Sequence, residues 1–185
     1  MNIVLASGSA RRKHMLEDLG LHPEVAPVTV SEARIRGTVD AQVLHIAKEK
    51  AQAVGEAHPG SLVLVADTML ADPDDATLAL GQPEDAQAAL AMLHRLRGRR
   101  HRVWSASGLR VGGMWTFDLA SAVVEFEPFS DDVLAELVLS GSWKGKAGAY
   151  DFAGAMRPFA TLVEGDEATV LGIPSCVLDA LKTLG

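Results

Sequence analysis

Two adjacent arginines, Arg11 and Arg12, begin a predicted helix over residues 11–19, directly after the small residues 7–10. The apolar run at residues 3–6 in front of them predicts a short buried strand. Free N–H groups in the first turn of a helix and the helix dipole both favour anions, and guanidinium groups match the geometry of phosphate. This pattern predicts an anion site between strand and helix. The alternative is a serine-capped helix with two solvated arginines.

Carboxylates that could hold a metal ion follow two other apolar segments. Asp67 comes after the run at residues 61–66, which is typical of a strand covered on both faces. Because ligands of open α/β sheets bind beyond the carboxyl ends of the strands, we expect Asp67 to lie at such an end and to hold Mg²⁺ together with substrate phosphates. Glu32 follows residues 28–30 and could share the metal and orient a water. The alternative for Asp67 is a turn residue that binds its own backbone.

Lys50 interrupts an apolar stripe on the helix predicted over residues 41–57, whereas Lys48 lies off that stripe. A lysine on the buried side of a helix must extend to solvent, pair with a carboxylate or meet a ligand. Extension to solvent is the commonest of the three outcomes.

A glycine-rich segment over residues 141–150 carries Lys144 and Lys146. It is not a P-loop, because only three residues separate Gly141 from Gly145 and Ala147 stands where a serine or threonine is required. We expect a flexible basic loop whose backbone can approach a ligand closely. The alternative is a mobile surface turn.

The composition is that of a single globular domain over residues 1–185, with 48% hydrophobic and 22% charged residues. The formal net charge of -7 disfavours binding to a nucleic acid polymer or an anionic membrane. No apolar run approaches the roughly 18 residues of a membrane span. A lone cysteine, Cys176, excludes an intrachain disulfide and fits the reducing cytoplasm.

Strand-like and helix-like segments alternate along the chain, which predicts an α/β fold around a mixed sheet. The second half contains a long predicted hairpin joined at residues 112–113, which suggests a second lobe. A groove between the two lobes would be a natural ligand site. The remaining predicted elements are a strand over residues 24–30, a helix opened by Pro83 and closed by Gly98, a helix over residues 130–141 that Ser130 caps, a strand over residues 159–163 and a helix after Pro174.

Taken in order along nearly the whole chain, a set of short motifs resembles the Maf family of nucleoside triphosphate pyrophosphatases, also described as septum-formation inhibitors. The motifs are Leu5-Ala6-Ser7-x-Ser9-x-Arg11-Arg12, Glu32, Lys50-Ala51, Ala66-Asp67-Thr68, Gly81-x-Pro83 with Met92-Leu93, Gly98-x-x-His101-x-Val103, Lys146-Ala147-Gly148-Ala149-Tyr150, Glu164-Gly165-Asp166 and Gly172-Ile173-Pro174.

This resemblance implies a Maf/inosine-triphosphatase-like fold, an elongated mixed sheet flanked by helices with a cleft between two lobes. It implies hydrolysis of a nucleoside triphosphate to the monophosphate and pyrophosphate, aided by Mg²⁺ or Mn²⁺, as a housecleaning activity on dTTP and UTP or on modified nucleotides such as 7-methyl-GTP. A homodimer is also implied, for which Trp104 and Trp115 on the predicted hairpin are candidate interface residues; packing in the core is the alternative for both.

The resemblance also assigns roles to individual residues. Asp67 and Glu32 would bind the metal and activate water, with Asp67 as the base, and Lys50 would neutralise charge in the reaction. The substrate-binding set would be Ser7, Ser9, Arg11, Arg12, Gln82 and Lys146.

Four positions depart from the family pattern. Gln82 replaces a lysine of the Gly-Lys-Pro motif, which removes a charge-assisted contact with a value of about 1.5–3 kcal/mol. Ala10 replaces a proline, Gly145 replaces an aspartate, and Ala153 replaces the glutamine that marks the dTTP/UTP branch. Of these departures, Gln82 and Ala153 favour an alternative function, a catalytically weakened nucleotide-binding regulator of cell division.

Overall fold

A seven-stranded mixed sheet forms the centre of the computed structural model, which describes residues 2–31 and 35–184. The strands lie in the order β2-β1-β3-β5-β6-β7, and β4 pairs with β3 outside this path. β1 is parallel to β2 and β3, and the remaining pairs are antiparallel. The bounds are β1 (Ile3–Leu5), β2 (Glu24–Val25), β3 (Leu62–Asp72), β4 (Asp75–Leu80), β5 (Arg100–Val111), β6 (Met114–Phe126) and β7 (Ala160–Glu164). The predicted α/β class with a mixed sheet is confirmed.

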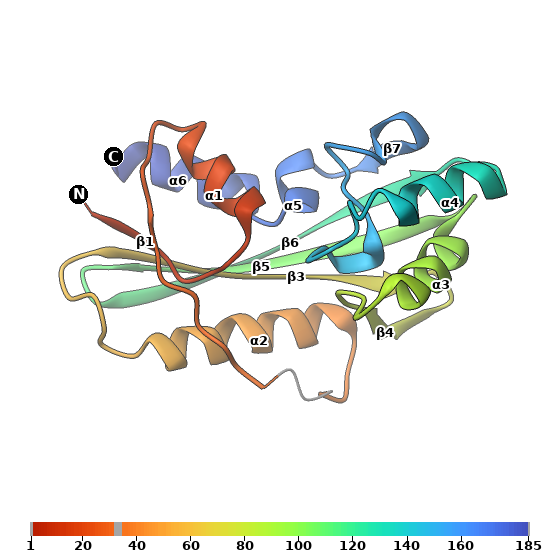
Figure 1. Cartoon of the computed structure of the whole chain (residues 1–185). Helices are drawn as coiled ribbons and strands as arrows, with labels where there is room; N and C mark the ends of the chain where they lie inside the picture. The colour runs from red at the N-terminus through yellow and green to blue at the C-terminus, as the bar shows by residue number, and fades with distance from the viewer. Residues whose placement is uncertain (1, 32–34, 185) are drawn as a thin grey trace.

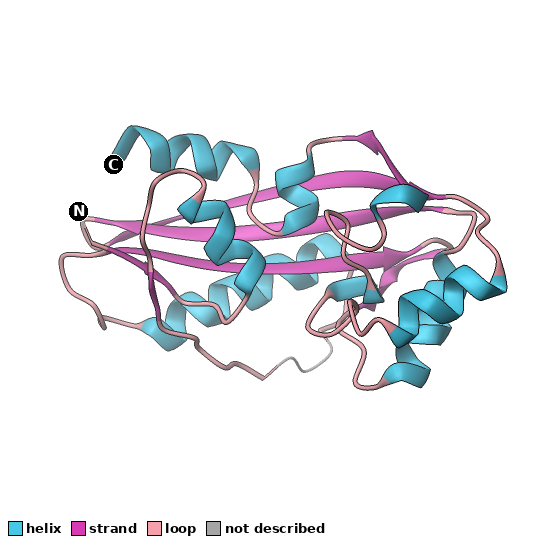
Figure 2. Cartoon of the chain, turned by 45° about the horizontal axis from the view of Figure 1, so that its top comes forward, coloured by secondary structure: helices cyan, strands magenta, loops and turns pink. Residues whose placement is uncertain are grey.

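Helices cover both faces of this elongated sheet (Figure 1). Helix α2 lies on one face, and α1, α5 and α6 lie on the other, while α3 and α4 gather at one end of the strands, as Figure 2 also shows. None of the helices in the described residues is long and apolar enough to cross a membrane. The bounds are α1 (Ala10–Glu17), α2 (Val39–Val54), α3 (Ala86–Leu96), α4 (Asp131–Leu139), α5 (Glu167–Leu171) and α6 (Ser175–Leu184), with short 3₁₀ turns η1 (Ala147–Ala149) and η2 (Arg157–Phe159).

The apolar core is divided between the two ends of the sheet. At one end, Leu5 and Leu64 pack with Leu181 of α6. At the other, Leu70 of the same strand as Leu64 packs with Leu93 of α3. Because β3 runs through both clusters, it connects the two lobes that the sequence predicts.

Local sequence accounts for several elements as predicted. The apolar stripe of α2 is buried; its residues are Val43, Ile46, Ala47, Ala51 and Val54. The β5–β6 hairpin turns at Gly112 and Gly113, whose φ angles are 57° and 86°. Both values lie in the left-handed region that a two-residue hairpin turn requires. Ser130 caps α4, as predicted, by accepting a hydrogen bond from the N–H of Val133.

Three predicted elements differ in extent. The strand predicted over residues 24–30 is only β2, because Pro27 has no N–H to continue a ladder. The helix predicted to open at Pro83 begins at Ala86, because the Asp85 carboxylate caps it by accepting the Ala88 N–H at 2.7 Å. The strand predicted to end at residue 66 continues as β3 to Asp72 and turns back into β4. The prediction ended it too early because two polar residues, Asp67 and Thr68, interrupt the apolar run.

Candidate active site

A gap along one edge of β3 creates the candidate site. β1 pairs with β3 only as far as Leu64, and β4 begins to pair with the same edge at Leu70. Asp67 lies between these two points, opposite Ala106 of β5. The prediction that Asp67 stands at the end of its strand is therefore wrong. It lies inside β3 but beside the end of β1, so its carboxylate still faces an opening in the sheet.

The loop after β1 enters this gap and begins α1. Ser9 caps the helix, since its Oγ accepts the N–H of Arg12 at 3.4 Å. Ser7 Oγ accepts the N–H of Ser9 at 3.3 Å, which keeps the loop tight. The sequence places these hydroxyls at the start of the helix, where they satisfy backbone donors that the helix leaves free.

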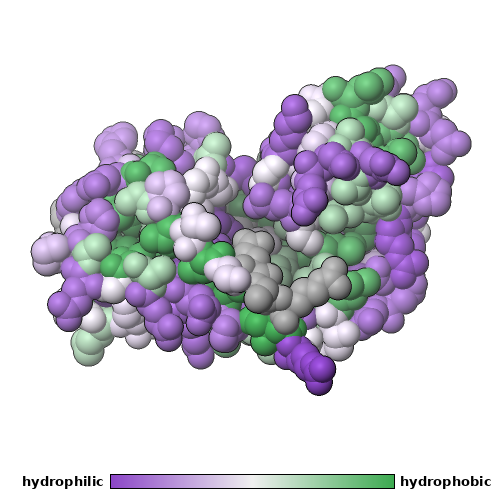
Figure 3. Space-filling view, turned by 60° about the horizontal axis from the view of Figure 1, so that its bottom comes forward, coloured by the Kyte–Doolittle hydropathy of each residue, from purple (hydrophilic) through white to green (hydrophobic). Residues whose placement is uncertain are grey.

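A cleft of about 300 Å³ opens between this loop and the other lobe. In the space-filling view of Figure 3 the surface is hollowed between the two ends of the molecule. The cleft brings together seven of the residues predicted from sequence: Ser7, Ser9, Arg11, Arg12, Lys50, Asp67 and Gln82. Lys146 is not among the lining residues, although its neighbours Gly145 and Ala147 are, and its Nζ lies 4.0 Å from Asp151 Oδ2. Glu32 lies outside the described residues.

An ion pair between Lys50 and Asp67 lies in the cleft. Lys50 Nζ donates to Asp67 Oδ1 at 2.8 Å and to the carbonyl of Ala66 at 3.3 Å. The two side chains are only 13% and 11% exposed. Of the three outcomes open to a lysine on this face of α2, the structure shows pairing with a carboxylate rather than extension to solvent. The pair places the Lys50 amino group next to the Asp67 carboxylate, which is a potential general base.

Arg11 and Arg12 differ in their surroundings although they are adjacent in α1. Burial lowers the pKa of Arg12 to about 10, against the opposing attraction of the Asp67 carboxylate, so the guanidinium stays charged at neutral pH. Arg12 is bound on three nitrogens by groups of the protein. Burial also lowers the pKa of Arg11, with the Asp151 carboxylate acting in the opposite direction. Arg11 forms no hydrogen bond with another described residue, so its guanidinium is available to a ligand.

The donor set of the cleft fits a Mg²⁺ or Mn²⁺ ion only in a particular way. Asp67 supplies the one carboxylate among the described residues of the lining, and the described residues contain no group of three or more His, Cys, Asp and Glu that could hold a metal. Mg²⁺ is usually bound by one or two carboxylates with several waters and substrate phosphates. The described residues of the lining therefore fit an ion that one carboxylate binds together with waters and substrate phosphates.

The glycine-rich segment closes the cleft from the other lobe and is packed, which corrects the expectation of a flexible loop. Residues 147–150 are buried, and the N–H of Gly148 donates to the carbonyl of Gly81 at 3.0 Å. Gly148 has a φ of 71°, and a Cβ there would lie 2.3 Å from Leu70 Cδ2. Gly148 thus serves close packing against Leu70 of β3, and its hydrogen bond to Gly81 holds Gln82, the next residue, at the edge of the cleft.

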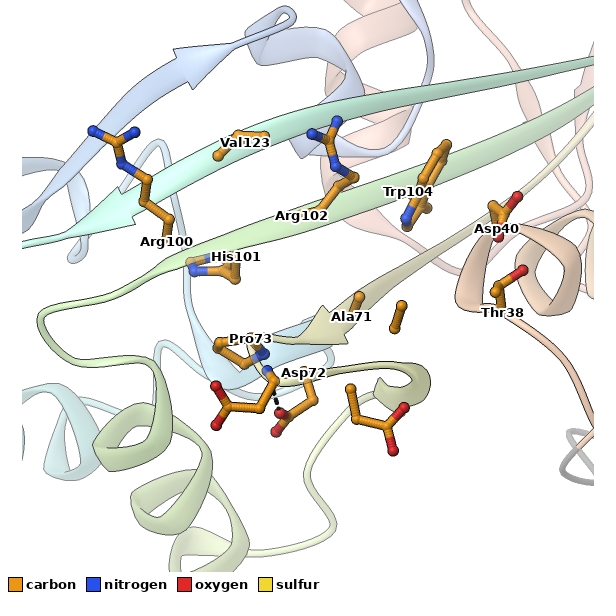
Figure 4. Close-up of a pocket in the computed structure, with 13 residues that line it drawn as sticks. Thr38, Asp40, Ala71, Asp72, Pro73, Arg100, His101, Arg102, Trp104 and Val123 are labelled. Atoms are coloured by element: carbon orange, nitrogen blue, oxygen red, sulfur yellow. Dashed lines mark hydrogen bonds between the residues drawn. The ribbon is translucent and has the colours of Figure 1, made fainter.

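A larger cavity of about 590 Å³ lies elsewhere, between the β3–β4 turn, β5 and the start of α2 (Figure 4). Its charged residues are largely matched by neighbours: Arg95 binds Asp72 at 2.7 Å, and Arg102 lies 3.2 Å from Glu164. The smaller cleft instead contains the strand–loop–helix anion site, an unmatched Arg11 and a paired lysine and carboxylate. The chemistry therefore favours the smaller cleft as the active site.

Thr68 also lines this cleft, and sequence analysis gave it no role of its own. Its Oγ1 lies 2.8 Å from Ser105 Oγ and accepts from Arg12 Nη2 at 3.0 Å. Because side chains alternate along a strand, the sequence could have predicted that Thr68 lies on the face of β3 opposite to Asp67. Its partners Arg12 and Ser105 come from distant segments, which no local pattern reveals.

Comparison with known proteins identifies the class to which this fold and site belong. The family model described as Maf-like protein matches residues 2–183, so the chain belongs to the Maf-like family. Curated relatives are named dTTP/UTP pyrophosphatase. That of Nitratidesulfovibrio vulgaris is 38% identical (97% of this chain, 85% of the relative), and that of Roseobacter denitrificans is 36% identical (92% and 90%). That of Pyrococcus horikoshii is 32% identical (100% and 97%). Among solved structures, the Staphylococcus aureus Ham1 protein has a TM-score of 0.48 at 15% identity (69% of this chain, 73% of that chain).

Proposed function

We propose that this protein hydrolyses nucleoside triphosphates to the monophosphate and pyrophosphate, with dTTP and UTP as its principal substrates. The relatives that carry this name match nearly the whole chain, and membership of the Maf-like family supports the same activity. The observation that carries the proposal is the paired Lys50 and Asp67 facing the arginine-bearing loop across one cleft.

The reaction proceeds by attack of water on the α-phosphorus. A bond forms between the water oxygen and the α-phosphorus, the bond from that phosphorus to the bridging oxygen breaks, and pyrophosphate leaves. Asp67 orients the water and accepts its proton. A bound Mg²⁺ or Mn²⁺ supplies charge neutralisation to the phosphate oxygens. The chain's own residues position and neutralise the substrate, which is the main requirement of phosphoryl chemistry.

The phosphates lie against the loop between β1 and α1. Arg11 and the free N–H groups at the start of α1 bind their oxygens, and Ser9 keeps that helix end in place. Lys50 moves its contact from Asp67 to the substrate as negative charge enters the cleft. Glu32 completes the metal site in this proposal, and Lys146, whose neighbours Gly145 and Ala147 line the cleft, contributes positive charge near it.

A second candidate function is favoured by Gln82. It is exposed at the wall of the cleft and brings no charge where the family motif has a lysine. Such a protein would bind nucleotides and turn them over slowly or not at all, as a regulator, for example of cell division.

Two further expectations belong to this proposal. We propose a homodimer, because β7 pairs only with residues 123–126 of β6, which leaves the rest of that strand edge free among the described strands. Trp104 and Trp115 do not support it, since both are half-buried and pack against apolar clusters of the core, as the alternative for them expects. Sedimentation at a single monomeric mass over a range of concentrations would contradict it. We also expect a cytoplasmic location, where pyrimidine nucleotides are found and the exposed Cys176 stays reduced.

The direct test is pyrophosphate release from dTTP, UTP, CTP, 7-methyl-GTP and ITP with Mg²⁺, repeated with excess EDTA. We expect turnover of dTTP and UTP that stops when the metal is chelated. Preference for 7-methyl-GTP would correct the substrate but keep the reaction. Nucleotide binding without pyrophosphate release across the panel would support the regulatory function instead.

A further inference from the structure

We infer that Arg12, Thr68 and Ser105 are positioning residues, which hold the phosphate loop and the strand of Asp67 in register, and that Arg11 alone of the two arginines binds the phosphates. This inference rests on the proposed function and divides its predicted binding set into two roles.

The side chain of Arg12 is committed to the protein. Nε donates to the carbonyl of Gly172 at 2.9 Å, Nη1 donates to Ser7 Oγ at 2.9 Å, and Nη2 donates to Thr68 Oγ1 at 3.0 Å. The residue is 8% exposed. A guanidinium fixed on all three nitrogens, and bridging three separate segments, cannot turn toward a ligand without breaking these contacts. Its geometry therefore suits the fixing of those segments.

The contact with Thr68 continues across the sheet. Thr68 Oγ1 lies 2.8 Å from Ser105 Oγ, and Ser105 Oγ donates to the carbonyl of Thr169 in α5 at 2.7 Å. Thr68 and Ser105 face each other in the β3–β5 register, and Ser105 is fully buried. A continuous chain of hydrogen bonds thus links Ser7 to α5.

These hydrogen bonds contact β3 on the face opposite to the Asp67 carboxylate. Successive side chains of a strand point to opposite faces, so Thr68 faces Arg12 while Asp67 faces Lys50 on the other side. Fixing Thr68 Oγ1 between two partners fixes the backbone at the position from which the Asp67 carboxylate extends. The Ser7 contact fixes the phosphate loop to the same guanidinium. One cation thereby sets the spacing between the base and the phosphate site.

Gly172 shows how closely this arrangement is packed. Its φ is +113°, and a Cβ there would lie 3.0 Å from Arg12 Nε and 3.1 Å from Thr68 Oγ1. Glycine leaves the space that lets the backbone carbonyl of α5's C-cap receive the guanidinium. Arg11, one position earlier, has no such partner among the described residues and lines the open cleft.

The test compares Thr68→Val, which removes the hydroxyl, with Thr68→Ser, which keeps it, and uses Thr116→Val as a matched control on the hairpin. For each we would measure kcat and KM with dTTP, the affinity for a non-hydrolysable α,β-imido analogue, and hydrogen–deuterium exchange of residues 5–12. Arg11→Gln serves as the binding variant.

We expect Thr68→Val to lower kcat by about 10- to 100-fold, the cost of an ångström-scale misplacement, with analogue affinity almost unchanged. Exchange in residues 5–12 should rise, and Thr68→Ser should restore both. Arg11→Gln should instead weaken analogue binding by about tenfold or more. If Thr68→Val fails to fold, Ser105→Ala takes its place.

Unchanged kcat and unchanged exchange in Thr68→Val would overturn the inference, as would an equal loss of analogue affinity in Thr68→Val and Arg11→Gln. Absence of turnover in the wild-type protein would refute the proposed activity alone. The exchange and binding measurements would still decide the positioning role in that case.

Discussion

Replacing Lys50 by methionine tests how strongly the ion pair in the cleft is held. Methionine keeps the length of the side chain and packs on the apolar face of α2, so the change removes the ammonium group and little else. The Asp67 carboxylate then keeps its 11% exposure without the donor that lay at 2.8 Å. On β3, Val65 and Ala66 before it are buried, and Met69 on the same face is half-buried.

The expected loss of stability follows from this geometry. Removing one partner of a buried ion pair costs about 3–5 kcal/mol, because the remaining charge has no compensation. The cleft gives both groups some contact with water, so we expect the lower end, about 3 kcal/mol. For a chain of 185 residues this corresponds to a fall in Tm of about 6–12 °C.

Urea unfolding followed by tryptophan fluorescence would measure this loss in Lys50→Met, Asp67→Asn and the double variant. The double variant should be more stable than the sum of the single losses predicts, by about 0.5–3 kcal/mol. Lys48→Met, on an exposed position of the same helix, is the control and should change stability by less than about 1 kcal/mol. A wild-type midpoint for Lys50→Met, or strict additivity in the cycle, would refute the reasoning.

Three other perturbations have defined outcomes. His101 is buried against Tyr150, and burial lowers its pKa to about 3. The unfolded chain therefore binds a proton that the folded protein excludes, so the free energy of unfolding should fall by about 1.4 kcal/mol per pH unit as the pH drops below about 6.5. His101→Phe should flatten that slope between pH 6.5 and 5, measured by urea unfolding, while the exposed His94→Gln should leave it intact; equal slopes in all three proteins would contradict this. Gly172→Ala should lower the unfolding free energy by about 1–3 kcal/mol and should also lower kcat. Gly60→Ala is the control, since Gly60 has a φ of +76° and open space around it, and it should lower stability alone. A wild-type kcat in Gly172→Ala would argue against the close packing of Gly172 on Arg12 and Thr68. Gln82→Lys should raise kcat/KM for dTTP by about 10- to 100-fold, since it adds a charge-assisted contact at the cleft wall, and an unchanged value would show that position 82 does not meet the substrate.

The sequence predicted the elements whose signals are local. The stripe of α2, the Gly112–Gly113 turn and the Ser130 cap each follow from neighbouring residues, and all three are present. The same holds for Lys50, since its helical spacing alone put it on the buried side of α2. The strand–loop–helix at Ser7–Arg12 likewise combines signals that lie within a few residues of each other.

Features that depend on residues far apart in the sequence could not be predicted from such local signals. The extent of β3 past Asp67 depends on pairing with β5, for example of Thr68 with Ser105 and of Leu70 with Val103, and not on local hydrophobicity. The packing of Gly148 against Leu70 turned an expected mobile loop into a wall of the cleft. The sequence also could not separate Arg11 from Arg12, because their different partners belong to β3 and to the segment after α5.

The most direct test of the proposed activity is single-turnover pyrophosphate release from dTTP by the wild-type protein and by Asp67→Asn, with nucleotide binding measured on the same samples. We predict that the wild-type protein releases pyrophosphate, and that the variant binds the nucleotide but releases pyrophosphate slower by a factor of about 100 or more, the contribution of a positioned general base. Release at the wild-type rate by Asp67→Asn would contradict the assignment of this cleft as the catalytic centre.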